Sequence, residues 1–209
     1  MLGIHHYWLF IATAIVLILT PGQDTFFILG RSIASGRPAG IAAALGVSAG
    51  TIVHTCAAAL GLSALLATSP YAFMAVKLAG AAYLLYIGVR ALLTPANGLP
   101  GADADGDGGR WPAFRQGIVT NLLNPKVALF FLALMPQFIS TGSTHKVGAF
   151  LALGFSFVAM GLVWCTILAV GASYLRKAFL RRPSLASWMN RVAGTMFIAL
   201  GLRLATTRQ

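Results

Sequence analysis

The sequence Thr20-Pro21-Gly22-Gln23-Asp24 places a proline and a carboxylate inside an apolar run that is long enough to cross a bilayer. Proline has no N–H for the carbonyl four residues earlier, and its ring displaces that carbonyl, so we expect an interrupted helix. Within hydrocarbon, such a break is tolerated only where protein or a water-filled cavity surrounds it. A carboxylate at the membrane centre costs roughly 2.5 to 3.5 kcal/mol on insertion scales. The stretch therefore predicts a broken transmembrane helix that contributes to a transport site.

The residues around the break also predict how the helix resumes. Thr20 suits the N-cap position, and a proline such as Pro21 suits the first position of a helix. Gln23 would complete a Thr-x-x-Gln capping box with Thr20. We therefore expect a second helix that opens at Asp24.

Six apolar stretches have the length of about 20 residues that crosses hydrocarbon. Of the 209 residues, 58% are hydrophobic and 9% are charged, and the mean hydropathy is +0.81. Because the spans leave no extramembrane domain of useful size, a function has to lie among the helices. The predicted spans are 7–29, 39–66, 71–93, 117–139, 147–174 and 188–205.

The positive charge of the chain does not indicate a nucleic-acid partner. The net charge is +11, but most of the fifteen lysines and arginines lie in short loops, where they set the orientation in a membrane. With the N-terminus outside, nine of them lie on the cytoplasmic side and about two on the other side. This asymmetry predicts that both termini are periplasmic. The nine are Arg31, Arg37, Arg90, Arg110, Arg115, Arg176, Lys177, Arg181 and Arg182.

The two halves of the chain resemble each other. Pro21 matches Pro125 at an offset of 104, and later matches have offsets of 108 and 114, so the offset grows only across loops. Each repeat has three spans, an odd number, so the second copy enters the membrane from the opposite side, as in the inverted repeats of secondary transporters. The repeats are residues 1–93 and 117–209, and the stretch 94–116 between them reads as a flexible loop. The predicted fold is an all-α membrane protein of six transmembrane helices in two inverted three-helix repeats, with the first and fourth helices broken at Pro21 and Pro125.

The second break, Asn124-Pro125-Lys126, has the same order of an N-cap residue, a proline and a charge. The charge is now a cation. A lysine in the first turn of a helix faces the positive end of the helix dipole, which is unfavourable unless an anion lies nearby. Asp24 is the expected resident anion, and a substrate carboxylate is the second candidate. The alternative is a structural ion pair that locks the two halves together, and the two roles can coexist.

Two further polar side chains fall within predicted spans. His54 lies in the middle of the second span, where it suits a proton relay or a plain hydrogen bond between helices. Lys77 lies near the outer end of the third span, where it either extends to the membrane surface or lies on the permeation path. Arg191 is its counterpart in the second repeat and has the same two interpretations.

Two motifs have structural interpretations. Residues 103–108 resemble the start of an EF-hand loop, but position twelve would be Phe114 and the chain has no glutamate, so a calcium site is not expected. No other metal or cofactor site is expected. Gly46 and Gly50 form a GxxxG pattern, which favours close helix packing either within the chain or between subunits of a homodimer.

With these residues placed, the chain resembles the LysE/RhtB family of amino-acid exporters over essentially its whole length. The resemblance implies an inner-membrane transporter, not an enzyme, that exports amino acids or their derivatives and is driven by the proton gradient. Many relatives have Pro-Asn where this chain has Gln23-Asp24, which leaves open whether substrate charge or coupling differs. The motifs that carry the resemblance are Thr-Pro-Gly at 20–22, residues 77–84 with Gly88, and residues 117, 121–126, 130–131 and 136–138.

Our hypothesis for the mechanism places a zwitterionic or cationic amino acid between the two broken helices. Its carboxylate lies near Lys126 and a helix N-terminus, and its ammonium lies near Asp24 and the freed carbonyls of Leu17 and Asn121. Asp24 is the expected proton carrier, because substrate binding can discharge it, and His54 is a second candidate for coupling. The expected partners are the amino acid, protons and membrane lipid. The predicted binding residues are Thr20, Pro21, Gly22, Gln23, Asp24, Asn121, Asn124, Pro125 and Lys126.

Two other classes of membrane protein remain as alternatives. A transmembrane thiol–disulfide electron carrier would use Cys56 and Cys165, one in each half, but both are expected to lie away from the prolines and no Cys-x-x-Cys motif occurs. An exporter of metal cations would need several carboxylates or histidines in the spans, and Asp24 is the only acid there.

Overall fold

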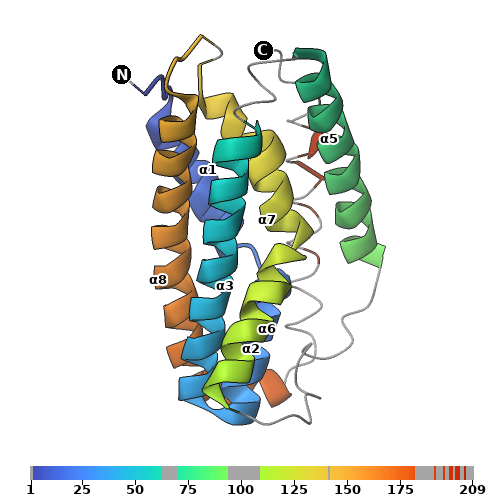
Figure 1. The fold of residues 1–209 in the computed structure, drawn as a ribbon. Coiled ribbons are helices and arrows are strands. Elements are labelled where there is room, and N and C mark those ends of the chain that lie inside the picture. The colour runs from blue at the N-terminus through green and yellow to red at the C-terminus, as the bar shows by residue number, and fades with distance from the viewer. Residues whose placement is uncertain are drawn as a thin grey trace.

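The computed structural model describes residues 2–62, 70–93, 109–140 and 142–181, with a few further positions between 191 and 205. These parts are helical, and the helices run side by side in an elongated bundle (Figure 1). They contain no strand, although an isolated bridge joins Ile4 to Ile139. In chain order the elements are α1 (Tyr7–Leu19), α2 (Gln23–Ser35), α3 (Arg37–Ala57), the π-helix η1 (Ala58–Leu62), α5 (Pro70–Leu93), α6 (Arg110–Leu122), α7 (Pro125–Leu129), the π-helix η2 (Phe130–Leu134), the 3₁₀-helix η3 (Met135–Phe138) and α8 (Lys146–Arg181).

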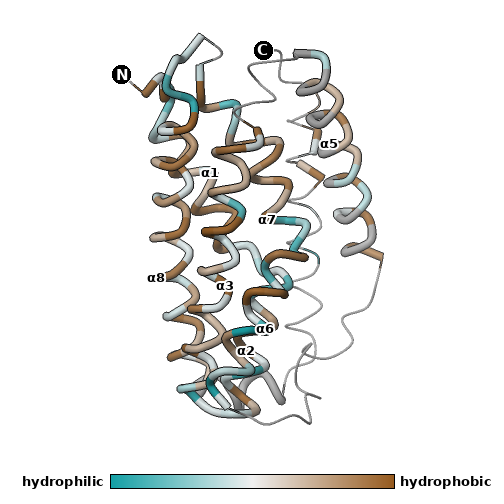
Figure 2. Tube along the Cα trace, viewed as in Figure 1, coloured by the Kyte–Doolittle hydropathy of each residue, from teal (hydrophilic) through white to brown (hydrophobic). Residues whose placement is uncertain are grey.

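Two to four membrane spans are present by length and composition within the described ranges. Arg37–Leu62 and Lys146–Ala172, of 26 and 27 residues, are each long and apolar enough to cross a bilayer. Two more segments qualify if each bent helix pair is taken as one span. Hydrophobic residues follow the lengths of the helices, while hydrophilic residues gather at the ends and also at mid-height where α6 gives way to α7 (Figure 2). Such polar groups at mid-depth need partners other than lipid.

The predicted helix breaks at Pro21 and Pro125 are confirmed. Tyr7–Leu19 with Gln23–Ser35, and Arg110–Leu122 with Pro125–Phe138, each bend by 47° at a short break. The pairs run in opposite directions, because α1 and the end of the second pair lie at one end of the bundle, while α2 and α6 lie at the other (Figure 1). The contacts agree, since the ring centroid of Phe10 in α1 lies 5.4 Å from that of Phe138 in η3.

Close packing between α3 and α6 depends on small residues. A Cβ added to Gly50 would lie 2.8 Å from the Cβ of Asn121, and one added to Gly117 would lie 2.6 Å from the carbonyl oxygen of Ala43. Gly46 likewise packs against the backbone of α6. The GxxxG pattern of Gly46 and Gly50 therefore serves packing within the chain, which brings α6 and its break directly against α3.

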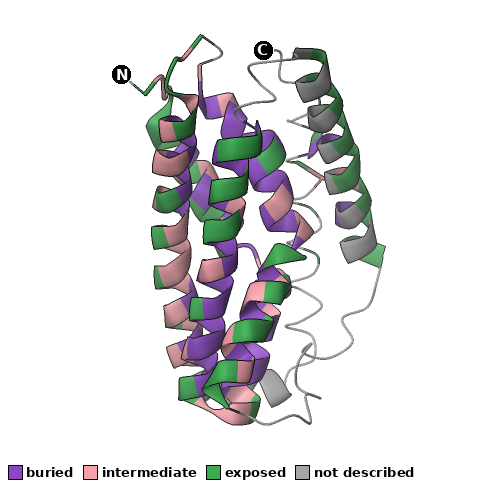
Figure 3. Ribbon diagram, viewed as in Figure 1, coloured by how far each residue is buried: buried purple, intermediate pink, exposed green. Residues whose placement is uncertain are grey.

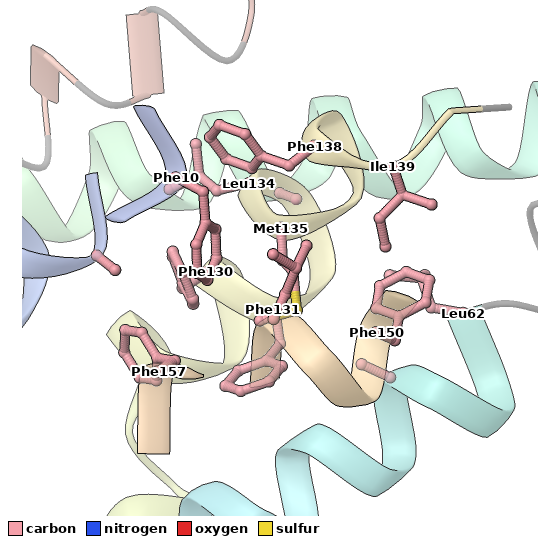
Figure 4. Close-up of a cluster of buried hydrophobic side chains, with 14 of the residues drawn as sticks. Phe10, Leu62, Phe130, Phe131, Leu134, Met135, Phe138, Ile139, Phe150 and Phe157 are labelled. Atoms are coloured by element: carbon pink, nitrogen blue, oxygen red, sulfur yellow. The ribbon is translucent and has the colours of Figure 1, made fainter. Parts of the chain in front are cut away.

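An aromatic cluster fills the core on the α1 side of the two breaks (Figure 4). Phe130 stacks on Phe157 of α8 with ring centroids 4.4 Å apart, and Phe10 and Phe131 pack around this pair. Buried residues face one another across α3, α6 and α7, whereas exposed residues lie along the outer sides of α5 and α8 (Figure 3). Burying several phenylalanines stabilises this end, since each fully buried large apolar side chain contributes about 1.5 to 3 kcal/mol.

Several helix ends differ from the predicted span limits. α2 continues to Ser35, beyond the predicted span end at residue 29, and α3 begins at Arg37, before the predicted start at residue 39. α6 begins at Arg110, before the predicted span 117–139. Hydropathy locates the apolar part of a helix, and polar turns extend these helices beyond it. The predicted third span matches α5, while most of the predicted sixth span, 188–205, lies outside the described residues.

Candidate functional site

The first break is a stretch of extended backbone between α1 and α2. Thr20 and Gly22 are both extended, and Gly22 is the N-cap of α2 without a side-chain cap. The hydroxyl of Thr20 donates to the carbonyl of Val16 at 2.7 Å, within α1. The predicted capping box of Thr20 and Gln23 is therefore wrong, because threonine hydroxyls often bond back to the preceding turn. Gln23 is exposed, as the first residue of α2.

Asp24 lies in the first turn of α2 and is 8% exposed. Its Oδ2 accepts a hydrogen bond of 2.8 Å from Nδ2 of Asn121 in α6. Its Oδ1 has no hydrogen-bond partner in the described part of the chain. An acid in the first turn is favoured by the helix dipole, yet a buried oxygen without a partner is costly. The carboxylate therefore has one oxygen, Oδ1, that accepts no hydrogen bond among the described residues.

The second break follows the prediction. Oδ1 of Asn124 accepts from the backbone N–H of Lys126 at 3.0 Å, and Pro125 occupies the first turn of α7. Lys126 is 7% exposed. Its ammonium donates to the carbonyls of Thr20 at 2.9 Å and Leu17 at 3.3 Å. A cation at the C-terminal end of a helix is favourable, so Lys126 stabilises the broken end of α1.

The acid and the base share this region without bonding to each other. Asp24 and Lys126 interact electrostatically, but the described contacts include no direct ion pair between them. Asp24, the expected resident anion, lines the same cavity as Lys126, while the ammonium itself bonds to the carbonyls of α1. For the same reason the carbonyl of Leu17 is not free.

Asn121 links four groups at the centre of the bundle. Besides its bond to Asp24, its Oδ1 lies 3.3 Å from the donor hydroxyl of Thr51. Its carbonyl accepts from the backbone N–H of Asn124 at 3.0 Å and lies 3.2 Å from Nε2 of His54. The plain interhelical hydrogen bond predicted for His54 is confirmed, and its ring also stacks on Phe131. This carbonyl is therefore not free either.

Asp24 and Lys126 line a cavity of about 40 Å³. That volume has room for about three water molecules. One side carries Asp24, Asn121 and Lys126, and most of the rest is apolar. The remaining lining residues are Leu17, Ile18, Thr25, Val47, Ser48, Thr51, Val127, Phe157, Val158, Gly161, Leu162, Trp164 and Cys165.

The chain matches the sequence model of LysE type translocators over residues 15–208. It belongs to this translocator family. An uncharacterized membrane protein of Pseudomonas aeruginosa is 32% identical over 98% of this chain and 97% of its own length. The translocator is also similar to the leucine efflux proteins of Klebsiella pneumoniae, at 31% identity, and Salmonella typhimurium, at 28%, each over 98% of this chain and 96% of the relative. No solved structure matches it.

The structure brings part of the predicted site together. Asp24, Asn121 and Lys126 line the cavity of the translocator, as predicted for a site between the broken helices. The backbone carbonyl of Thr20 accepts a hydrogen bond from the ammonium of Lys126, and the side chain of Asn124 accepts one from the backbone N–H of Lys126. Gly22 leaves room for Lys126, whose Nζ would lie 3.1 Å from an added Cβ.

Cys165 departs from its predicted location. It lines the cavity with Asp24 and Lys126, so the expectation that both cysteines lie away from the breaks is wrong for this one. Cys56 is exposed, and both thiols are free. Helical spacing along α8 brings Cys165 to the site from a distant part of the sequence, which no local motif signals.

Arg31 was missed as a buried residue. It is 2% exposed, donates to Oε1 of Gln116 in α6, and lies over the ring of Phe27 at 5.9 Å. The signal available in the sequence is its spacing of seven residues from Asp24, which puts both on one face of α2. α2 therefore contacts α6 through two polar links, one acidic and one basic.

Other predicted sites are not tested by the described residues. Lys77 lies within α5, but its side chain falls outside them, as do residues 103–108. Arg191 is exposed. Over the described ranges, no group of three or more His, Cys, Asp or Glu side chains that could hold a metal ion is present.

Proposed function

We propose that this translocator is a secondary transporter that exports amino acids or their derivatives across the bacterial inner membrane. The leucine efflux proteins among its relatives support this proposal. The observation that carries it is the pair Asp24 and Lys126, opposite charges buried on the wall of one cavity between two bent helices. A zwitterionic amino acid needs one group of each sign, held apart, and charges within a membrane bundle typically mark a substrate or ion pathway.

The unused polar atoms support a specific binding mode. The unpaired Oδ1 of Asp24 accepts the substrate ammonium. The carboxylate of the substrate attracts the ammonium of Lys126, which then exchanges the carbonyls of α1 for this anion. Trp164 lines the same cavity, and its Nε1 is a buried donor with no partner in the described structure. This N–H supplies a second donor for the carboxylate, since buried donors need partners.

Proton coupling follows from competition at Asp24. The substrate ammonium and a proton both neutralise the same carboxylate, so binding of one excludes the other. Outward release of the substrate then leaves Asp24 ready to take a proton for the return step, which gives antiport. His54 bonds to the backbone carbonyl of Asn121, whose side-chain Nδ2 donates to Asp24, so His54 lies close enough to the proposed proton carrier to be a second candidate for coupling.

The proposed conformational change is a rocking of two inverted three-helix repeats, residues 1–93 and 117–209, about the breaks. The opposite directions of the two bent pairs support this arrangement. The stretch before α6, residues 94–109, connects the repeats, and both termini lie in the periplasm. A cavity of about 40 Å³ is too small for an amino acid, so the repeats have to separate before a substrate enters.

Transport into proteoliposomes with an imposed pH gradient tests the proposal. The purified protein is expected to move radiolabelled leucine against its gradient, and Asp24→Asn is expected to abolish the gradient-driven part. Gln23→Asn is the matched control, because Gln23 is the exposed neighbour. Undiminished gradient-driven transport by Asp24→Asn, or no transport of any amino acid by the unmodified protein, would refute the proposal.

A further inference from the structure

One stripe of α8 forms the apolar wall of the cavity. Phe157, Gly161 and Cys165 are four residues apart and so lie on the same face of the helix. All three line the cavity. Phe157 and Cys165 are buried, at 5% and 9% exposure, whereas Gly161 between them is half-buried. The wall is therefore indented at Gly161.

Packing does not require a glycine at this position. A Cβ added to Gly161 would meet no atom within 4 Å, whereas one added to Gly154 on the same helix would collide with the side chain of Thr55. Gly148 is also crowded, with Leu2 at 2.9 Å. Since glycine weakens a helix interior relative to alanine, Gly161 costs stability and allows no closer packing in return. The space beside it has another use.

The surroundings indicate which substrate group fits that space. Val47, Leu162 and Phe157 contribute apolar side chains to the same cavity. Asp24 is the only acid among the described residues, and in the proposed function it binds the α-ammonium. A second cationic group on the substrate would have no acidic partner there.

We propose that Gly161 sets the size of the substrate side chain and that this side chain is uncharged and aliphatic. The inference rests on the proposed function, because it assigns the indentation to the substrate bound at Asp24 and Lys126. When the repeats separate, the side chain extends toward α8 and occupies the volume that a Cβ and its substituents would fill. A larger residue at 161 removes that volume, so it excludes large substrates before small ones.

Exchange of labelled alanine, valine and leucine in proteoliposomes tests this assignment in Gly161→Ala and Gly161→Leu. Hydrophobic pockets discriminate about 10-fold or more per missing or added methylene. Gly161→Leu is expected to lower leucine exchange at least about tenfold while alanine exchange changes less than about threefold, and Gly161→Ala is expected to give a smaller shift in the same order.

Gly171 provides the matched control. It lies on α8 about 15 Å further along the helix, has no atom within 4 Å of an added Cβ, and does not line the cavity. Gly171→Leu is expected to leave the ratio of leucine to alanine exchange unchanged. Elution as a single species in detergent verifies that each variant is folded, and Gly161→Ala provides the test if Gly161→Leu fails this criterion.

The outcomes separate this inference from the proposed function. Equal loss of all three substrates in both folded Gly161 variants, or no change in their ratio, overturns the role of Gly161. If Asp24→Asn still abolishes gradient-driven transport in that case, the exporter assignment stands without it. Faster exchange of lysine than of leucine by the unmodified protein overturns the uncharged substrate class, and absence of any amino-acid exchange overturns both proposals.

Discussion

The two helix breaks share their geometry and differ in how they are stabilised. Each bent pair turns by 47° at a proline. At the break at Pro125, the side chain of the adjacent Asn124 caps α7. The break at Pro21 has no side-chain cap at the start of α2, and the groups that stabilise it come from the other pair.

Residues of the second pair complete the first. Lys126 binds the carbonyls at the end of α1, and Asn121 binds the carboxylate at the start of α2. The α6–α7 pair therefore supplies the side-chain partners of the α1–α2 break. In the proposed rocking motion, separation of the two pairs releases both the last carbonyls of α1 and Asp24, so the first break is expected to respond to opening.

Removal of the Lys126 ammonium is expected to have the largest effect. Lys126→Met deletes two hydrogen bonds from a charged donor, each worth about 1.5 to 3 kcal/mol, and also the cation that attracts the substrate carboxylate. Export is expected to fall at least about 100-fold, and the thermal midpoint of the detergent-solubilised protein is expected to fall. Lys146→Met, at the start of α8, is the matched control.

Full export together with an unchanged thermal midpoint in Lys126→Met would contradict the dependence of the first break on the second. A lowered midpoint with full export would limit Lys126 to a structural role. Flux and thermal unfolding are measured on the same preparation, so these outcomes are distinguishable.

Truncation of Asn121 is expected to have an intermediate effect. Asn121→Ala removes the hydrogen bond that Oδ2 of Asp24 accepts and leaves the carbonyl of Val47 as the acceptor of the Thr51 hydroxyl. The cost is about 1 to 3 kcal/mol of stability, and export is expected to fall about tenfold because Asp24 loses its orientation. Val119→Ala, an exposed position on α6, is the control. Wild-type flux and stability in Asn121→Ala would show that Asp24 is positioned by α2 alone.

The smallest expected effects compare the two residues before the prolines. Asn124→Ala removes an N-cap and is expected to lower stability by about 1 kcal/mol. Thr20→Val removes a hydroxyl that donates to the carbonyl of Val16 and does not cap α2, so a smaller cost than that of Asn124→Ala is expected. Chemical unfolding of both variants measures the difference. A larger loss of unfolding free energy for Thr20→Val than for Asn124→Ala would contradict the conclusion that only the break at Pro125 is capped by the residue before its proline.

Local chemistry made the breaks predictable. Pro21 and Pro125 lack an N–H wherever they lie, and Asn124 caps a helix through an atom two residues away. The convergence of Asp24, Asn121 and Lys126 was expected from the matched positions of the two breaks in the similar halves of the sequence. These features depend on few residues, so the sequence was sufficient for them.

The partners of individual side chains were not predictable in this way. Lys126 bonds to carbonyls about 106 to 109 residues earlier in the chain, and which acceptor it reaches depends on how α1 and α7 lie against each other. Arg31 is buried because α2 extends past the apolar run and packs on α6. The hydroxyl of Thr20 donates to the carbonyl of Val16 instead of accepting from the backbone N–H of Gln23, and the sequence pattern is compatible with both.

The position of Cys165 provides a native probe of the site. One sulfur lies at the cavity and the other, on Cys56, faces outward. Replacing Cys56 alone leaves a unique thiol beside the charged pair among the two cysteines of the chain. Because this thiol is only 9% exposed, a thiol reagent reaches it when the proposed separation of the repeats widens the cavity, so the rate of labelling reports that step without any engineered residue at the site.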